Sequence, residues 1–216
     1  MLRRTFLKSA VSMLPTAALA KTTGGRRPNI IFILSDDLGY GDIASYGQAK
    51  IRTPRIDRLA RDGMRFTQGY AGAPVCSPSR AALLTGLHTG HARIRDNFAL
   101  AGGKLGYKGQ QQIRRASLTP ADTTVAQHLR AAGYKTGVMG KWHLDGYDRA
   151  AVPTNFGFDE FKGWLVTEPT TEGYYPIKRM HGTEMVDVSE NAGGAKRLYD
   201  TDLIASDAID FVERHR

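Results

Sequence analysis

Residues 29–37 have the sequence NIIFILSDD, and this stretch decides which fold class we expect. Its first six residues are apolar without interruption, which is typical of a strand buried on both faces in a parallel sheet. Helical and extended patterns then alternate along the chain. We expect helices at 53–63, 77–86, 119–132 and 198–212, and extended segments at 64–71 and 134–139. This alternation predicts an α/β fold with a mostly parallel sheet flanked by helices.

Two further segments lack a clear period. Residues 101–118 are rich in Gly and Gln, which predicts an exposed loop, and residues 145–195 contain scattered Gly, Pro and aromatic residues without a regular pattern. We therefore expect both segments to be irregular.

The composition and charge exclude several classes of protein. The chain has 216 residues, of which 41% are hydrophobic and 24% charged, as in ordinary globular proteins. No run of 18 or more apolar residues occurs, so no stable membrane insertion is expected. The net charge is +9, but no basic-aromatic stripe or nucleic-acid motif accompanies it, so no nucleic-acid partner is expected. Six basic residues and no acid precede residue 28: Arg3, Arg4, Lys8, Lys21, Arg26 and Arg27.

The first 27 residues have the order of a targeting segment followed by a short linker. Residues 3–8 are RRTFLK, an apolar run follows over 9–20, and that run ends in ALA, a cleavage pattern. The order resembles a twin-arginine signal peptide, which implies the twin-arginine export machinery as a partner and a periplasmic or secreted location. A frayed basic N-terminus is the alternative.

The strongest chemical feature is residues 76–86, CSPSRAALLTG, which contain the only cysteine of the chain, Cys76. Pro78 fits the first turn of a helix, so Cys76 is expected just before a helix N-terminus, where free N–H groups attract anions. Arg80 follows about one turn later and can face the same place. The pattern predicts a sulfate or phosphate site. A buried structural thiol beside a surface arginine is the alternative.

An acidic pair follows the first predicted strand. Asp36 and Asp37 would stand at its carboxyl end, where open α/β sheets hold their ligands. Carboxylate oxygens suit Ca²⁺ or Mg²⁺. Both can reach one ion only if the chain turns after them, which residues 38–41, LGYG, permit. Asp42 receives no role.

A third pattern is GKWHL at residues 140–144. In an extended segment Lys141 and His143 share a face and can converge on one anion. The alternative is a surface lysine beside a packed histidine.

These three patterns together resemble the type I, formylglycine-dependent sulfatases (arylsulfatases) of the alkaline-phosphatase-like superfamily. Residues 76–86 match C-x-P-S-R-x-x-x-L-T-G throughout, residues 35–42 resemble the metal-binding opening of the family, and residues 140–144 follow in the expected order.

The resemblance implies sulfate-ester hydrolysis. Cys76 would be oxidised to formylglycine (3-oxoalanine) by a formylglycine-generating or anaerobic sulfatase-maturating enzyme. A hydroxyl of the hydrated aldehyde would then attack sulfur and release the alcohol, and the resulting sulfo-enzyme would expel sulfate. The resemblance also implies that Asp36, Asp37 and the modified Cys76 hold Ca²⁺, with Mg²⁺ as the alternative.

The remaining motif residues receive roles by the same resemblance. Arg80 would stabilise the modified side chain, Lys141 would bind sulfate oxygens, and His143 would bind substrate and orient or deprotonate the hydrated aldehyde.

We expect minor roles for several other residues. We expect His88 and His91 to pack or line the rim, and residues 155–161, NFGFDEF, to be structural. Tyr174 and Tyr175 would border the substrate entrance.

The resemblance covers residues 28–216, as the N-terminal portion of a catalytic domain. A further Asp/Asn metal pair, a second His and a second Lys have no counterpart here, and Asp96-Asn97 was set aside because it follows the cysteine motif too closely. We therefore expect a truncated sulfatase, weakly active or inactive as this chain. The alternatives are a phosphonate or phosphate monoester hydrolase of the same superfamily, and an inactive periplasmic fragment.

Overall fold

The computed structural model describes residues 27–100, 102–108, 110–166, 171–172 and 174–216. Nearly all of the predicted signal segment, residues 1–26, lies outside the described residues. The chain divides into two units, residues 1–34 and residues 35–216, and each is described by itself.

In the first unit, residues 29–34 do not form the buried strand that the apolar run predicted. They are extended but unpaired with any strand of the described chain, and the side chains from Ile30 to Leu34 are 46% to 81% exposed. An extended segment becomes a strand only where a neighbour takes up its backbone hydrogen bonds, and an apolar pattern cannot supply that neighbour. The prediction of a buried strand is wrong for this structure.

The second unit holds all the helices and strands of the described residues. They are η1 Tyr40–Asp42, η2 Ala44–Tyr46, α1 Pro54–Asp62, α2 Cys76–Thr85, β1 Lys104–Lys108, β2 Gln111–Arg115, α3 Val125–Ala131, β3 Gly137–Lys141, η3 Pro153–Phe156, β4 Glu160–Trp164, β5 Thr171–Glu172, β6 Tyr175–Pro176, β7 Lys178–His181, β8 Glu184–Asp187, η4 Ser189–Gly194 and α4 Asp200–His215.

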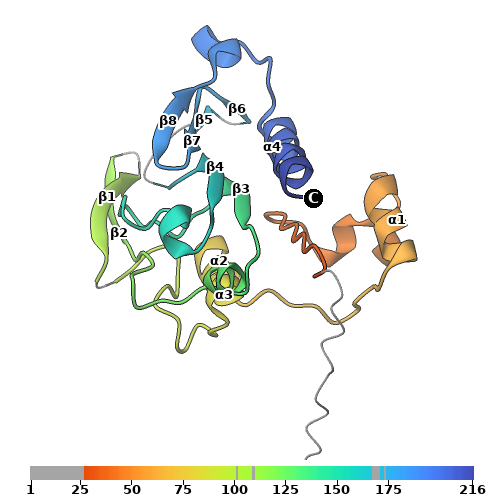
Figure 1. Ribbon diagram of the computed structural model, residues 1–216, viewed down its shortest axis with the longest axis horizontal. Helices are drawn as coiled ribbons and strands as arrows, with labels where there is room; N and C mark the ends of the chain where they lie inside the picture. Colours follow the sequence, from red (N-terminus) through yellow and green to blue (C-terminus); the bar gives the residue numbers. More distant parts are fainter. Residues whose placement is uncertain (1–26, 101, 109, 167–170, 173) are drawn as a thin grey trace, which may run out of the picture. The chain divides into compact units, whose positions relative to one another are not determined.

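The central sheet has the strand order β3-β4-β7-β8 (Figure 1). β3 and β4 are parallel, whereas β4–β7 and β7–β8 are antiparallel, so this sheet is mixed and not mostly parallel as predicted. The antiparallel strands come from residues 145–195, which were expected to be irregular. Strands of only four or five residues are too short to show a clear period in the sequence.

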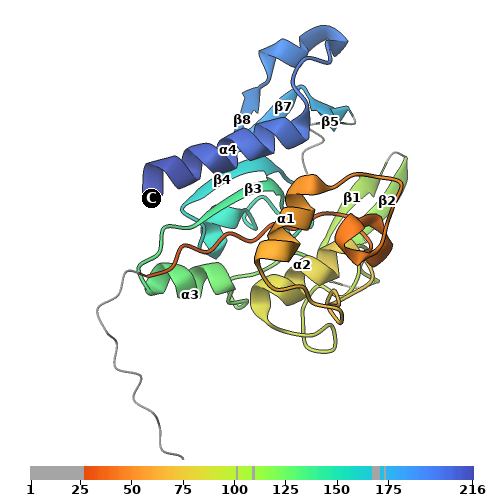
Figure 2. The same ribbon diagram turned by 90° about the vertical axis from the view of Figure 1, so that its right-hand side faces the viewer.

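Helix α4 lies along β3 and β4, and Figure 2 shows α3 on the other side of these strands. The approach of α4 needs small residues in β3. A Cβ on Gly137 would lie 2.9 Å from the Phe211 ring, and one on Gly140 would lie 3.3 Å from Ile204. The prediction of a terminal amphipathic helix is confirmed, with bounds shifted to 200–215.

An apolar core surrounds Trp142, the residue that follows β3. Trp142 is 2% exposed, its indole Nε1 donates to the carbonyl of Ala151 at 2.7 Å, and its ring packs near Phe156 and Phe158. The other members of this buried cluster are Ala81, Ile94, Leu118, Leu144, Val152, Phe161, Leu165 and Met180.

The helix ends follow the sequence signals closely in two cases. α1 begins at Pro54 and is capped by Gly63, and α2 ends at Gly86, which has a left-handed φ of 69°. α3 begins later than predicted, at Val125, because Thr124 forms a capping box with Gln127.

The residues before α3 make a turn in place of the first helical turn that was predicted. The carboxylate of Asp122 accepts hydrogen bonds from the backbone N–H of Thr119 at 2.8 Å and from its hydroxyl at 2.9 Å. Such local side-chain bonds compete with helix formation.

Two other segments differ from expectation. Residues 64–71 are not in a strand, and residues 101–118 contain the antiparallel hairpin β1–β2 where a loop was predicted. None of the helices in the described part of the chain is long and apolar enough to cross a membrane.

Candidate functional site

The carboxyl end of β3 brings together three of the predicted site residues. Lys141 is the last residue of β3, and its Nζ donates to Oδ2 of Asp36. Arg80 projects from the second turn of α2 and donates from Nη2 to Oδ1 of the same carboxylate at 2.7 Å. Two cations from distant parts of the chain therefore share one anion.

Arg80 also joins α2 to β3. Its Nη1 donates to the backbone carbonyl of Lys141 at 2.7 Å, and its side chain is only 13% exposed. Burial acts to raise the pKa of Asp36, but its hydrogen bonds and ion pairs with Lys141 and Arg80 outweigh burial and hold that pKa below its usual range. Asp36 is thus a charged counterion for both bases.

Cys76 lies at the N-terminus of α2, as its first residue and not just before it. The preceding residue, Val75, makes no side-chain cap, so the helix end depends on other groups. Asn97 supplies one: its Oδ1 accepts from the backbone N–H of Ser77 at 3.0 Å. The amide of Asn97 also lies within 3.5 to 3.6 Å of the half-buried thiol of Cys76.

His143 takes an unusual backbone conformation for a non-glycine residue, with a φ of 60°. Its carbonyl accepts from the hydroxyl of Ser77 at 2.8 Å, and its ring Nε2 lies 2.9 Å from Nη1 of Arg115. Burial, together with the positive charges of Lys141, Arg115 and Arg80, lowers the pKa of His143 to about 3. The ring is therefore neutral at ordinary pH.

Trp142 explains how the flanking residues reach the site. Because its side chain is buried in the core, Lys141 and His143 on either side are held out of the core. The two do not simply share a strand face as predicted, since the left-handed turn at His143 ends the extended geometry. The positive charge of Lys141 still acts on the His143 ring, where it contributes to the lowered pKa.

Buried polar atoms without partners gather here. Within the described residues, Nδ1 of His143, Nε of Arg80 and Nε of Arg115 are buried and make no hydrogen bond. Buried polar groups are rarely left unpaired, so these atoms suit a site that receives a polar ligand.

The predicted metal ligands are only partly brought together. Asp37 follows Asp36 with a φ of 56°, so the chain turns where the shared-ion prediction required a turn. However, no group of three or more His, Cys, Asp or Glu side chains in the described part of the chain could hold a metal ion. The carboxylates have the right donor chemistry for a hard cation, but they supply only part of a coordination shell.

Asn97 and Arg115 are site residues that the sequence did not reveal. Asn97 was set aside as a metal ligand, and Arg115 lies in the segment that was expected to be an exposed loop. Only the alternation of side chains along β2 could have placed Arg115 on an inward face, and the sequence pattern did not reveal this strand.

The minor predictions have mixed outcomes. The rings of His88 and His91 stack edge to face on each other at 4.6 Å, in an exposed turn. Residues 155–161 are structural as predicted, since the Asp159 carboxylate accepts from the backbone N–H of Thr136 at 3.0 Å and Phe161 is buried.

Tyr174 and Tyr175 both pack against Tyr199, which precedes α4. Their position at a substrate entrance stays a prediction.

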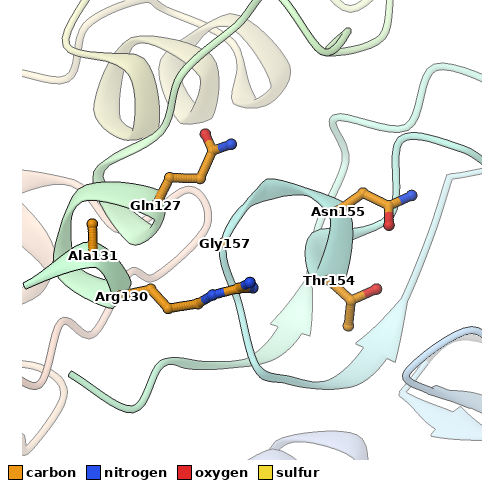
Figure 3. A pocket seen from close by; sticks show the side chains of 6 residues that line it. All are labelled: Gln127, Arg130, Ala131, Thr154, Asn155 and Gly157. Atoms are coloured by element: carbon orange, nitrogen blue, oxygen red, sulfur yellow. The ribbon is translucent and has the colours of Figure 1, made fainter. Parts of the chain in front are cut away.

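A cavity of about 370 Å³ lies apart from these residues, between α3 and η3 (Figure 3). Gln127 and Arg130 from α3 and Thr154 and Asn155 from η3 contribute to its lining. None of the predicted site residues lines this cavity, so we do not assign the chemistry to it.

Comparisons with known proteins agree with the three motifs. The family profile described as Sulfatase matches residues 28–214. Human arylsulfatase D is 42% identical over 153 residues, which cover 68% of this chain and 25% of that protein. Steryl-sulfatase of Mus musculus is 43% identical over 143 residues, covering 64% of this chain and 22% of that protein. The match thus spans about a quarter of the length of these curated relatives.

Solved structures share the fold. The crystal structure of Ps i-CgsB has a TM-score of 0.65 and 28% identity, covering 88% of this chain and 42% of that one. BT4656, solved in complex with its substrate D-glucosamine-2-N,6-O-disulfate, has the same TM-score and identity and is covered over 32% of its chain. The α/β, alkaline-phosphatase-like fold predicted from the sequence is confirmed, and the chain belongs to the sulfatase family.

Proposed function

We propose that this chain contributes the N-terminal part of the catalytic domain of an enzyme that hydrolyses sulfate esters, with the chemistry of an arylsulfatase. The observation that carries the proposal is the convergence of Arg80 and Lys141 on Asp36, close to the N-terminus of the helix that Cys76 begins. Two cations and a helix N-terminus favour a tetrahedral anion.

The residues of the chain take complementary roles. Lys141 is a compact positive charge for sulfate oxygens, whereas Arg80 is held by its bond to the carbonyl of Lys141 and stabilises residue 76. Asp36 keeps both cations in place before substrate arrives. The neutral ring of His143 offers a hydrogen bond to the group at residue 76 without adding another charge.

Residue 76 supplies the nucleophile as formylglycine, made from Cys76 by a formylglycine-generating or anaerobic sulfatase-maturating enzyme. The surroundings of the thiol suit such a group, because the Asn97 amide can donate to and accept from a hydroxyl in that position. When formed, the modified residue supplies a hydroxyl that attacks the sulfur atom.

A divalent cation, Ca²⁺ with Mg²⁺ as the alternative, is part of the proposal. Asp36 and Asp37 would hold it through carboxylate oxygens, together with residue 76. The cation would compete with Arg80 and Lys141 for the Asp36 carboxylate.

The proposed setting is the periplasm or the outside of the cell. The basic, apolar and small-residue order of residues 3–20 supports export by the twin-arginine machinery. That machinery carries folded proteins, which suits a protein that is modified before export.

The test is an assay of the full-length product of the reading frame, expressed with a maturation enzyme. We expect a higher kcat/KM for 4-nitrophenyl sulfate than for the matched phosphate and phosphonate, and loss of sulfate turnover in Cys76→Ala. Intact mass of the peptide containing Cys76 should show formylglycine. An unmodified thiol in a competent host, or a preference for phosphate, would contradict the proposal.

A further inference from the structure

The ring of His143 has a defined hydrogen-bonding direction. Its Nε2 lies 2.9 Å from Nη1 of Arg115, and a guanidinium can donate but not accept. Nε2 must therefore accept, and a neutral ring then carries its proton on Nδ1. The low pKa of His143 agrees with a neutral ring. That Nδ1 is the atom of this ring that is buried without a partner in the described part of the chain.

Arg115 is itself held firmly in place. It is the last residue of β2, in the hairpin with β1, and its guanidinium lies over the rings of Phe98 at 5.1 Å and Tyr147 at 5.6 Å. Its Nη1 also donates to the backbone carbonyl of Asn97 at 3.2 Å. Two cation–π contacts and a hydrogen bond to the main chain limit the orientations open to this guanidinium, so the direction of its N–H groups is restricted before any ligand binds.

The contacts of Arg115 close a loop around residue 76. From Arg115 the chain of contacts passes to Asn97, whose amide reaches the N–H of Ser77 and the thiol of Cys76. From Ser77 it returns through the hydroxyl to the carbonyl of His143, and from the His143 ring to Arg115. Four separate segments thus fix the orientation of one another.

We infer that Arg115 is a positioning residue of this site, which holds His143 in the Nδ1–H tautomer and, through Asn97, orients the side chain of residue 76. His143 then acts as a hydrogen-bond donor from Nδ1 toward its ligand. Arg115 acts through other residues and does not itself contact the reacting atoms. The inference rests on the proposed function only for its effect on turnover, since the tautomer can be measured without substrate.

The first test is the ¹⁵N NMR spectrum of the histidine rings in the full-length protein, with His143 assigned by its absence in His143→Gln. We expect a protonated Nδ1 and an unprotonated Nε2 in the wild type. Arg115→Ala should lose this preference, and Arg115→Lys should keep it, because an ammonium is also a donor without an acceptor. Arg114→Ala is the matched control: it removes the same charge from the neighbouring position on the opposite face of β2, where Arg114 bonds to the carbonyl of Gly103.

The second test is turnover of 4-nitrophenyl sulfate by the matured enzyme. Loss of a residue that orients others typically costs roughly 10- to 100-fold in activity, so Arg115→Ala should lower kcat by that factor with little change in KM. Arg114→Ala should stay near the wild-type value. Far-UV circular dichroism checks that each variant is folded, and if Arg115→Ala is not, the wild-type and Arg115→Lys spectra decide.

A protonated Nε2 in the wild type, or an unchanged Nδ1–H ring in folded Arg115→Ala, overturns the inference. If the tautomer depends on Arg115 but the wild type does not hydrolyse sulfate esters, the proposed function fails and the positioning role stands. If the wild type hydrolyses sulfate esters but its His143 ring is protonated on Nε2, the proposed function stands and the positioning role of Arg115 fails.

Discussion

Gly140 and Gly163 are register partners in the parallel pair β3–β4, and a Cβ on Gly163 would lie only 1.9 Å from the carbonyl oxygen of Gly140. The two strands approach this closely because neither partner has a side chain here. The next residue of β3 is Lys141, so this contact sets the position of a site residue.

Gly163→Ala should therefore destabilise the protein. The added methyl meets backbone and cannot be relieved by a side-chain rotation, so we expect a loss of about 1–3 kcal/mol in the free energy of unfolding. Urea denaturation measures it. Gly41→Ala is the control, because a Cβ there has nothing within 4 Å. Equal stability of the two variants would contradict the close approach.

Arg80→Lys tests the planar, two-sided contact of Arg80. A lysine cannot span both the Asp36 carboxylate and the carbonyl of Lys141, because it has one nitrogen at the end of its chain. We expect turnover of aryl sulfate to fall roughly 10- to 100-fold, as for other residues that orient a site. Arg93→Lys, which alters a surface pair with Asp122, should have little effect.

Trp142→Phe tests the anchor between Lys141 and His143. The substitution keeps an aromatic ring but leaves the carbonyl of Ala151 without its donor, and a buried unsatisfied group costs about 1–3 kcal/mol. We expect lower stability in thermal unfolding and reduced turnover together. Trp164→Phe, at a half-buried position on β4, is the control and should lose less.

The pair formed by Glu160 and Arg214 predicts a pH dependence of stability. Arg214 Nη1 and Nη2 donate to the two carboxylate oxygens at 2.8 and 2.6 Å, which ties the end of α4 to the start of β4. The hydrogen bonds from Arg214 are the main reason that the pKa of Glu160 is lowered to about 2, and His215 adds to them.

A lowered pKa in the folded state stabilises the protein above the unfolded pKa, here about 4.5, and this contribution is lost as the pH falls toward 2. The Tm of Glu160→Gln should thus lie below that of the wild type at pH 6, and the difference should shrink steadily as the pH falls from about 4.5 through about 2. Glu184→Gln, at an exposed position on β8, should show no such trend. A difference that is independent of pH would argue against the ion pair.

The sequence predicted where the site residues on regular elements lie. Cys76 and Arg80 belong to the first turns of α2 and Lys141 ends β3, because local patterns fix where a helix starts and where a strand stops. Asp36 lies in no helix or strand, although it meets both bases as a site residue. Whether Asp37 joins them on a cation is a prediction that no contact in the structure tests.

Asn97 and Arg115 could not be predicted in the same way. Arg115 reaches the site because the hairpin β1–β2 packs against the rest of the second unit, and strands of five residues give no clear period. Asn97 reaches it through tertiary contacts with Ser77 and Cys76, for which the sequence has no local signal. The prediction of a buried strand at 29–34 was wrong for a related reason, since burial depends on a neighbouring strand and not on the apolar run itself.

The left-handed backbone at His143 limits which residues this position tolerates. An alanine there would pay about 1–2 kcal/mol for the conformation alone, whereas asparagine, aspartate and glycine adopt it at lower cost. The effect of His143→Ala on activity would therefore combine the loss of the imidazole with a change in the main-chain conformation. His143→Asn removes the imidazole but retains the left-handed backbone, so it separates the two effects. The backbone conformation at residue 143 thus restricts which residues this position tolerates, independently of the chemistry of the imidazole.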